Sequence, residues 1–160
     1  MNARGYFGIG IYRSKCPPNV GTLWRSAQHL GAGFIFTIGE RFPVEARINP
    51  FAACREMKQQ TDTMKACRHI PWLDVESVEA LRMVVPAAEI VGVEIDGRSV
   101  SLPEFAHPQR AVYLLGAEDN GIRGTDRVYC DRLIEIPGGN YNVAVAGSLV
   151  MYDRLTKVKR

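Results

Sequence analysis

Short apolar runs recur along the chain, separated in most places by stretches whose apolar residues follow helical spacing. The runs are rich in β-branched and aromatic residues and end near Gly, Pro or charged positions, which is typical of buried strands. We expect strands at Phe7–Tyr12, Gly33–Gly39, Glu89–Ile95, Ala111–Gly116 and Leu133–Ile136. Strands of this kind predict a sheet that is covered by helices.

Three segments have the apolar spacing of helices. The first follows two prolines, with Asn19 as the expected N-cap and Gly31 as the C-terminal stop. The others are expected at Val75–Val85 and Tyr141–Leu155. Strands therefore alternate with helices, which favours a parallel sheet.

The stretch from residue 40 to residue 68 has no clear period. We expect a long loop there, or a short helix near Phe51–Lys58, followed by a short extended piece at residues 68–74. Residues 101–108 read as a turn or a single helical turn. We find no repeat or linker, and we expect one α/β domain over residues 1–160, with a mostly parallel sheet flanked by helices.

Composition narrows the class of protein without identifying it. Hydrophobic residues make up 46% of the chain, charged residues 23%, and the net charge is +3. No apolar run approaches the roughly 20 residues that span a bilayer, and the N-terminus lacks the apolar region of a signal peptide. The four cysteines are widely spaced without a CxxC pair, so we expect free thiols and no metal site, in a cytoplasmic protein.

Three stretches combine a strand end, glycine and polar residues that core packing does not explain. They are PPNVGTLWRSA, LLGAEDNG and IPGGNYNVAVAG. In open α/β sheets, ligands bind outside the carboxyl ends of the strands. Each stretch also has a purely structural interpretation: a surface or ion-paired Arg25, an acidic turn around Glu118, and a packed helix capped by Asn142. No Walker loop or dinucleotide fingerprint is present among them.

Taken in order, the three stretches resemble the motifs of the SpoU (TrmH-like) branch of the SPOUT RNA methyltransferases. NVGTLWRSA resembles the first motif, N-x-G-x-x-x-R-x-A, and LLGAEDNGI resembles the second, L-G-x-E-x-x-G-[LI]. IPGGNYNVAVAG resembles the third, an I-P stretch leading to N-V-[SA]-V-A. Each motif alone is weak, but the ordered set spans nearly the whole chain.

The resemblance implies an α/β fold whose C-terminal part forms a trefoil knot. It also implies S-adenosylmethionine as methyl donor, a homodimer, and a ribose 2′-hydroxyl of tRNA or rRNA as acceptor. The cofactor would lie in the loops after three strands. The residues expected to contact it are Val93, Glu94, Leu115, Gly116, Ile136, Pro137, Asn140, Asn142 and Ala146.

Catalytic roles follow from the same resemblance for Arg25, Asn19 and Glu118. A ribose hydroxyl is a poor nucleophile, so it needs deprotonation or a cation that stabilises the developing alkoxide. Because guanidinium has a pKa above about 12, we favour Arg25 as a ligand of phosphate and oxyanion, with a base role left open. Asn19 would hold its loop, and Glu118 would shape the pocket or orient Arg25.

Basic residues concentrate in the first half of the chain, either as a solvated surface or as an RNA backbone footprint. They are Arg13, Lys15, Arg41, Arg47, Arg55, Lys58, Lys65 and Arg68.

The third motif departs from the family pattern in two ways. Asn140 stands where the family usually has Ser, and the loop between Pro137 and Asn142 is a few residues shorter. This loop normally wraps the cofactor, so three alternatives stay open. They are a non-catalytic RNA-binding protein with a weakened cofactor site, a methyltransferase acting on a base nitrogen, and a small-molecule α/β enzyme.

Overall fold

A parallel sheet forms the centre of the molecule. The computed structural model describes residues 5–41, 61 and 63–158, and within them the sheet has seven strands in the order β3-β2-β1-β6-β4-β7-β5. All neighbouring strands are parallel, so their carboxyl ends lie along one edge. The strands are β1 (Tyr6–Tyr12), β2 (Phe34–Ile38), β3 (Trp72–Val75), β4 (Glu89–Val93), β5 (Val100–Ser101), β6 (Arg110–Leu115) and β7 (Arg132–Glu135).

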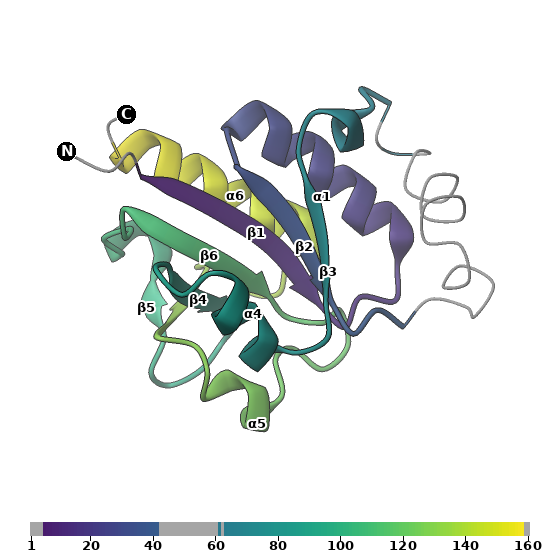
Figure 1. Ribbon diagram of the computed structural model, residues 1–160. Helices are drawn as coiled ribbons and strands as arrows, with labels where there is room; N and C mark the ends of the chain where they lie inside the picture. The colour runs from purple at the N-terminus through teal and green to yellow at the C-terminus, as the bar shows by residue number, and fades with distance from the viewer. Residues whose placement is uncertain (1–4, 42–60, 62, 159–160) are drawn as a thin grey trace.

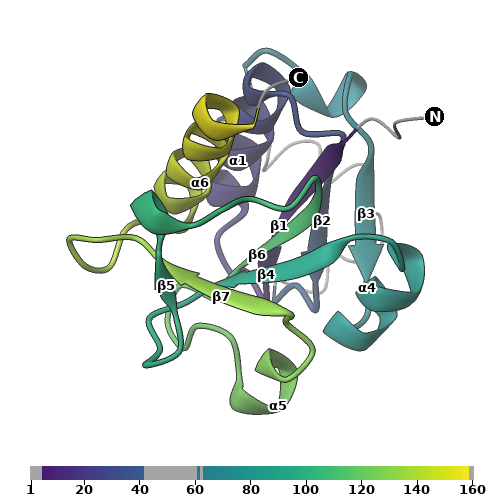
Figure 2. The ribbon, with the colours of Figure 1, turned by 90° about the vertical axis from the view of Figure 1, so that its left-hand side faces the viewer.

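Helices cover both faces of this sheet, which confirms the predicted α/β class. Two long helices lie side by side on one face, α1 (Pro17–Leu30) and α6 (Val143–Lys157), as Figures 1 and 2 show. The shorter α4 (Val78–Val84) and α5 (Gly124–Arg127) lie on the other face, and two 3₁₀ turns complete the described elements, η1 (Ala66–Arg68) and η2 (Leu102–Glu104). None of the helices in the described ranges is long and apolar enough to cross a membrane.

The core has two parts because side chains of a strand alternate between the faces of the sheet. Ile9 and Ile11 of β1 belong to the cluster beneath α1 and α6. Val112 and Leu114 of the neighbouring β6 belong to the cluster beneath α4. All four side chains are fully buried, as expected for strands covered on both faces.

The two long helices approach each other closely at Gly147. A Cβ atom on this residue would lie 2.4 Å from Cδ1 of Leu23 in α1 and 2.9 Å from Cδ1 of Leu115 in β6. Only glycine fits this contact without movement of the core. Ser148 continues the seam, since its hydroxyl donates to Ser26 Oγ of α1 at 2.9 Å.

The prediction that Asn19 caps the first helix is wrong. Helix α1 begins at Pro17 with Cys16 in the cap position, so both prolines lie in its first turn. Proline is tolerated there because the first N–H groups of a helix have no intrahelical partner. Asn19 is therefore a residue of the helix itself, and its side chain is available for other contacts.

Other boundaries differ modestly from the predictions. The segment predicted as a helix from Val75 divides into the end of β3 and a helix capped by Ser77, whose Oγ accepts from the Ala80 N–H at 3.0 Å. Strand β4 ends at Val93 rather than at Ile95, and the last helix begins at Val143, capped by Asn142. The short β5 and α5 were not predicted, while η2 confirms the single helical turn. The helix considered near Phe51–Lys58 lies outside the described residues.

Candidate functional site

A cavity of about 530 Å³ opens at the carboxyl edge of the sheet, where β4, β6 and β7 end. All the predicted cofactor contacts except Pro137 line it. The lining residues are Val93, Glu94, Ile95, Leu115, Gly116, Ala117, Glu118, Asp119, Asn120, Gly121, Glu135, Ile136, Gly139, Asn140, Tyr141, Asn142, Val143 and Ala146. Its volume is typical of a site for a small organic ligand.

A chain of hydrogen bonds connects the three motif regions beside this cavity. Asn19 Nδ2 donates to Glu118 Oε1 at 3.1 Å, and Asn19 Oδ1 accepts from Asn142 Nδ2 at 3.0 Å. Asn142 Oδ1 in turn accepts from the Ala144 N–H at 2.9 Å, which caps α6. The Asn142 amide therefore caps α6 with its oxygen and contacts Asn19 with its nitrogen, which confirms its structural interpretation as a helix cap.

Glu118 also accepts a hydrogen bond from Ser14, a residue that was not among the predicted site residues. Ser14 is fully buried directly after β1, and its hydroxyl donates to Glu118 Oε1 at 2.9 Å. The Lys15 N–H donates to Glu118 Oε2 at 3.4 Å. A buried hydroxyl at a strand end was the available signal, but its partner lies more than a hundred residues away.

Asp119, the next residue of the same loop, carries two ion pairs. Arg41 Nη2 lies 2.7 Å from Asp119 Oδ1, and Lys15 Nζ lies 3.2 Å from Asp119 Oδ2. The hydrogen bond from the Arg41 guanidinium holds the pKa of the Asp119 carboxyl well below its usual range. Asp119 is therefore a fixed negative charge at the cavity wall, and Lys15 and Arg41 are already engaged.

Glu94 supports the loop after β6 from the end of β4. Its Oε2 accepts from the Ile122 N–H at 2.6 Å and lies close to Gly121. Together with Glu118, Asp119 and Glu135, it gives the cavity four carboxylates. Because no Lys, Arg or His is among the described lining residues, the cavity suits a ligand with positive charge.

Arg25 lies elsewhere, on the outer face of α1. It lines a second cavity of about 600 Å³ with Thr22, Ser26, His29, Leu30, Thr61 and Thr63. Its Nη1 donates to Thr63 Oγ1 at 3.1 Å, so this contact, rather than one to Glu118, holds the side chain. Among the described residues Arg25 has no carboxylate partner, and the lining includes no acidic side chain. The second cavity therefore suits an anion.

The described residues contain no group of three or more His, Cys, Asp or Glu side chains that could hold a metal ion. The free cysteines of the described part include Cys16 and Cys130. Burial raises the pKa of the Cys130 thiol to about 11, so it is not a reactive thiolate at neutral pH.

Comparison with known proteins gives matches along most of the chain. The family described as the SpoU rRNA Methylase family matches residues 7–152. A 23S rRNA uridine 2′-O-methyltransferase of Streptomyces viridochromogenes is 26% identical over 153 residues, which are 92% of this chain and 52% of that protein. The chain thus spans about half the length of this relative.

Two solved structures extend the likeness to the fold. The AdoMet-bound rRNA methyltransferase of Sinorhizobium meliloti superposes with a TM-score of 0.79 at 22% identity, over 98% of this chain and 59% of that one. The TrmH/SpoU tRNA modifying enzyme of A. aeolicus gives 0.76 at 15% identity, over 96% and 76%. Since the family match covers both the sheet and the cavity edge, the chain belongs to the SpoU rRNA methylase family.

Proposed function

We propose that this protein transfers a methyl group from S-adenosylmethionine to a ribose 2′-hydroxyl of rRNA or tRNA. The observation that carries the proposal is the acidic cavity at the strand ends, joined to all three motif regions by the Glu118–Asn19–Asn142 hydrogen bonds. The relative of Streptomyces viridochromogenes is a 23S rRNA 2′-O-methyltransferase, and a tRNA modifying enzyme shares the fold. An RNA of either kind would place the protein in the cytoplasm.

The cavity residues fit this cofactor in charge and in size. S-adenosylmethionine carries a sulfonium and an ammonium cation besides one carboxylate, so its net charge is positive, and the carboxylates of Glu94, Glu118, Asp119 and Glu135 line the cavity. The cofactor supplies a methyl group made electrophilic by the sulfonium. The chain supplies the acidic wall, the backbone of Leu115 and Gly116, and the amide of Asn142, which would orient the ligand.

Arg25 would act on the RNA rather than on the cofactor. It is an unpaired cation among the described residues and lies beside the hydroxyls of Thr22, Ser26 and Thr63. A guanidinium can bind a phosphate oxygen bidentately and stabilise a developing alkoxide, while its high pKa opposes a base role. Since Arg25 does not line the acidic cavity of its own chain, it would serve the cavity of a second copy.

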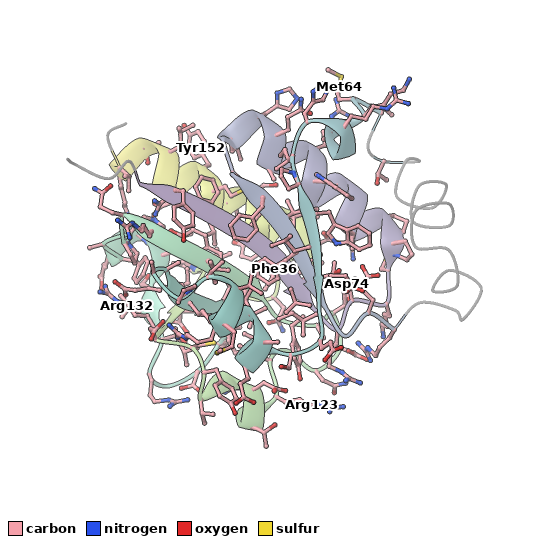
Figure 3. All side chains as sticks on the ribbon, in the orientation of Figure 1. Phe36, Met64, Asp74, Arg123, Arg132 and Tyr152 are labelled. Carbon is pink, nitrogen blue, oxygen red and sulfur yellow. The ribbon has the colours of Figure 1, made fainter. Side chains whose placement is uncertain are left out.

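A homodimer would bring Arg25 and that cavity together. Val145, Leu149 and Tyr152 lie on one face of α6 at helical spacing and are 47%, 37% and 60% exposed. Figure 3 shows Tyr152 directed away from the sheet. A stripe of this kind beside the seam with α1 is suited to pack against its own copy.

Exposed basic residues near α1 would extend the RNA contact. Lys65 and Arg68 of the original basic set are exposed around η1, close to α1. Arg47, Arg55 and Lys58 lie outside the described residues. We expect the phosphates of the RNA to give binding that weakens steeply with salt.

We also propose that the C-terminal part threads through the chain as a trefoil knot. The insertion of β7 between β4 and β5 supports this topology, as does the position of residues 139–142 against the loops after β4 and β6. An experimental structure that traces residues 116–146 would test whether the C-terminal part of the chain passes through a loop formed by earlier residues.

The function is tested by incubating the protein with labelled S-adenosylmethionine and rRNA or tRNA transcripts. Digestion to nucleosides and mass analysis would identify a 2′-O-methyl nucleoside. A base-methylated nucleoside would instead support the base-nitrogen alternative. RNA binding without binding of S-adenosylmethionine by calorimetry would support the non-catalytic alternative. If the protein bound neither RNA nor S-adenosylmethionine, the remaining alternative would be a small-molecule α/β enzyme.

Asn142→Ala is the variant that tests the site, because it removes both the cap of α6 and the hydrogen bond to Asn19. We expect about tenfold weaker cofactor binding, which corresponds to about 1.4 kcal/mol, because the amide that would orient the ligand is lost and the cavity wall is no longer held against Asn19. Met83→Ala, an exposed position on α4 away from the cavity, should bind as the wild type does. Thermal unfolding of both variants separates a loss of binding from a loss of folding.

A further inference from the structure

Tyr141 is an aromatic side chain on the wall of the acidic cavity that the motifs do not explain. Its side chain is 42% exposed, although the residue lines the cavity. None of the ring pairs among the described residues includes Tyr141. Aromatic rings have a large apolar surface, so a ring that lines a cavity without an aromatic neighbour is suited to contact a ligand.

The hydroxyl of Tyr141 fixes the position of this ring. It donates to the Pro137 carbonyl oxygen at 2.8 Å and thereby closes the short loop of the third motif. Gly138 and Gly139 turn the chain with φ of 105° and 116°, which favours glycine. A Cβ on Gly138 would lie 2.6 Å from the Tyr141 hydroxyl, so the ring lies directly over the loop.

Charge is distributed unevenly around the cavity. Of the four carboxylates, Glu94, Glu118 and Asp119 come from the loops that follow β4 and β6, and Glu135 lies at the end of β7. The part of the wall from Gly139 to Ala146 contributes no charged side chain. A ligand with cationic groups at one end and a flat ring at the other is therefore expected to place its ring on the side of Tyr141.

We propose, on the basis of the proposed function, that the ring of Tyr141 stacks on the adenine of the bound cofactor. Stacking on a fixed ring costs little conformational entropy, because the hydroxyl already holds the side chain. In this arrangement the rigid ring of Tyr141 makes the contact with the cofactor that a longer loop would otherwise make with its backbone. Tyr141 is in this role a specificity-determining residue for the purine part of the cofactor.

Two substitutions separate stacking from a purely structural role of the hydroxyl. Tyr141→Leu removes the ring, and Tyr141→Phe keeps the ring but removes the bond to Pro137. We expect Tyr141→Leu to bind S-adenosylhomocysteine and adenosine about tenfold more weakly, a loss that lies within the usual range for base–aromatic stacking. Tyr141→Phe should keep most of the affinity for both ligands, as measured by titration calorimetry.

Tyr129→Leu is the control, since Tyr129 is 36% exposed and does not line the cavity. Equal losses in the Phe and Leu variants would overturn the inference and assign the effect to the hydroxyl. So would unchanged affinity in both variants, or a loss for S-adenosylhomocysteine without one for adenosine. A wild-type protein that binds neither S-adenosylmethionine nor S-adenosylhomocysteine would overturn the proposed function as well.

Discussion

Asn19 joins, through one amide, parts of the chain that are far apart in sequence. Its nitrogen donates to Glu118 and its oxygen accepts from Asn142, so both ends of the amide are needed in their present orientation. Asn19→Asp would replace the donor by an oxygen that faces the Glu118 carboxylate. We expect the free energy of unfolding to fall by about 1–3 kcal/mol at neutral pH, measured by urea denaturation.

Asn120→Asp provides the matched control for this measurement. Asn120 is exposed in the same loop as Glu118, and no hydrogen bond of its side chain is present among the described residues. The same chemical change there should leave the stability within about 0.5 kcal/mol of wild type. Equal effects at both positions would show that Asn19 does not link the motifs.

His107 should make stability depend on pH. Its ring is fully buried, with Nδ1 2.6 Å from the Tyr113 hydroxyl and Nε2 2.8 Å from Asp153 Oδ2. Burial lowers the pKa of His107, so the unfolded chain takes up a proton more readily than the folded one. The free energy of unfolding should therefore decrease as the pH falls through about 6.5.

Urea denaturation at about pH 7.5 and about pH 5.5 tests this dependence, which should be smaller in His107→Gln because glutamine does not titrate. His69→Gln, at an exposed position, should keep the slope of the wild type. A slope that is unchanged in His107→Gln would assign the acid sensitivity to other groups.

Among the elements, the contact between α1 and α6 depends on Gly147. The sequence predicted both helices and offered a packed last helix as one interpretation, but not the partner of the contact. Gly147→Val would push two methyls against Leu23 and Leu115, and we expect a loss of about 1–3 kcal/mol in thermal or urea unfolding. Gly97→Val, where a Cβ meets nothing within 4 Å, should have little effect.

Element boundaries show where sequence patterns were sufficient. The buried strands were predicted because each is an apolar run, and Asn142 because a polar cap precedes an apolar helix. The start of α1 was missed because an Asn after two prolines resembles a cap, while proline itself is tolerated in the first turn. The two-residue β5 was missed because its hydrogen bonds to β7, rather than its own residues, define it.

The candidate site was predictable only in part. The lining residues follow from strand ends, which the pattern gives, and from the resemblance to known motifs. Ser14, Asp119 and Tyr141 were missed because their roles depend on partners that sequence spacing does not bring together. The position of a residue directly after a strand can be read from the local sequence, whereas a hydrogen bond across the edge of the sheet depends on residues that are far apart in the chain.

For the whole molecule, the central question is whether two copies share the active site. Leu149→Arg would place a charge in the apolar stripe of α6, and we expect a shift toward monomer in analytical ultracentrifugation together with loss of methyl transfer. Met83→Arg, on the opposite face of the sheet, should leave both unchanged. A monomeric variant with full activity would contradict the shared site.

Mixed dimers offer an independent measurement at the same scale. At a cofactor concentration well below the dissociation constant of the Asn142→Ala variant, Arg25→Ala and Asn142→Ala should each have little activity alone, since they remove different parts of one composite site. Subunits mixed in equal amounts should regain about one quarter of the wild-type activity, because half of the dimers then hold one intact site. No recovery after subunit exchange would place Arg25 in the cavity of its own chain.

The pairing of β1 with β6 has a consequence for how the protein is made. β1 lies between β2 and β6, and its register partners in β6, from Arg110 onward, are about 100 residues later in the chain. At synthesis rates of about 5–20 residues per second, one edge of β1 stays open for about 5–20 s. Such an edge can pair with other chains during translation. The acidic cavity is completed later still, when residues 135–146 have left the ribosome, so a truncated nascent chain has most of the sheet and no complete ligand site.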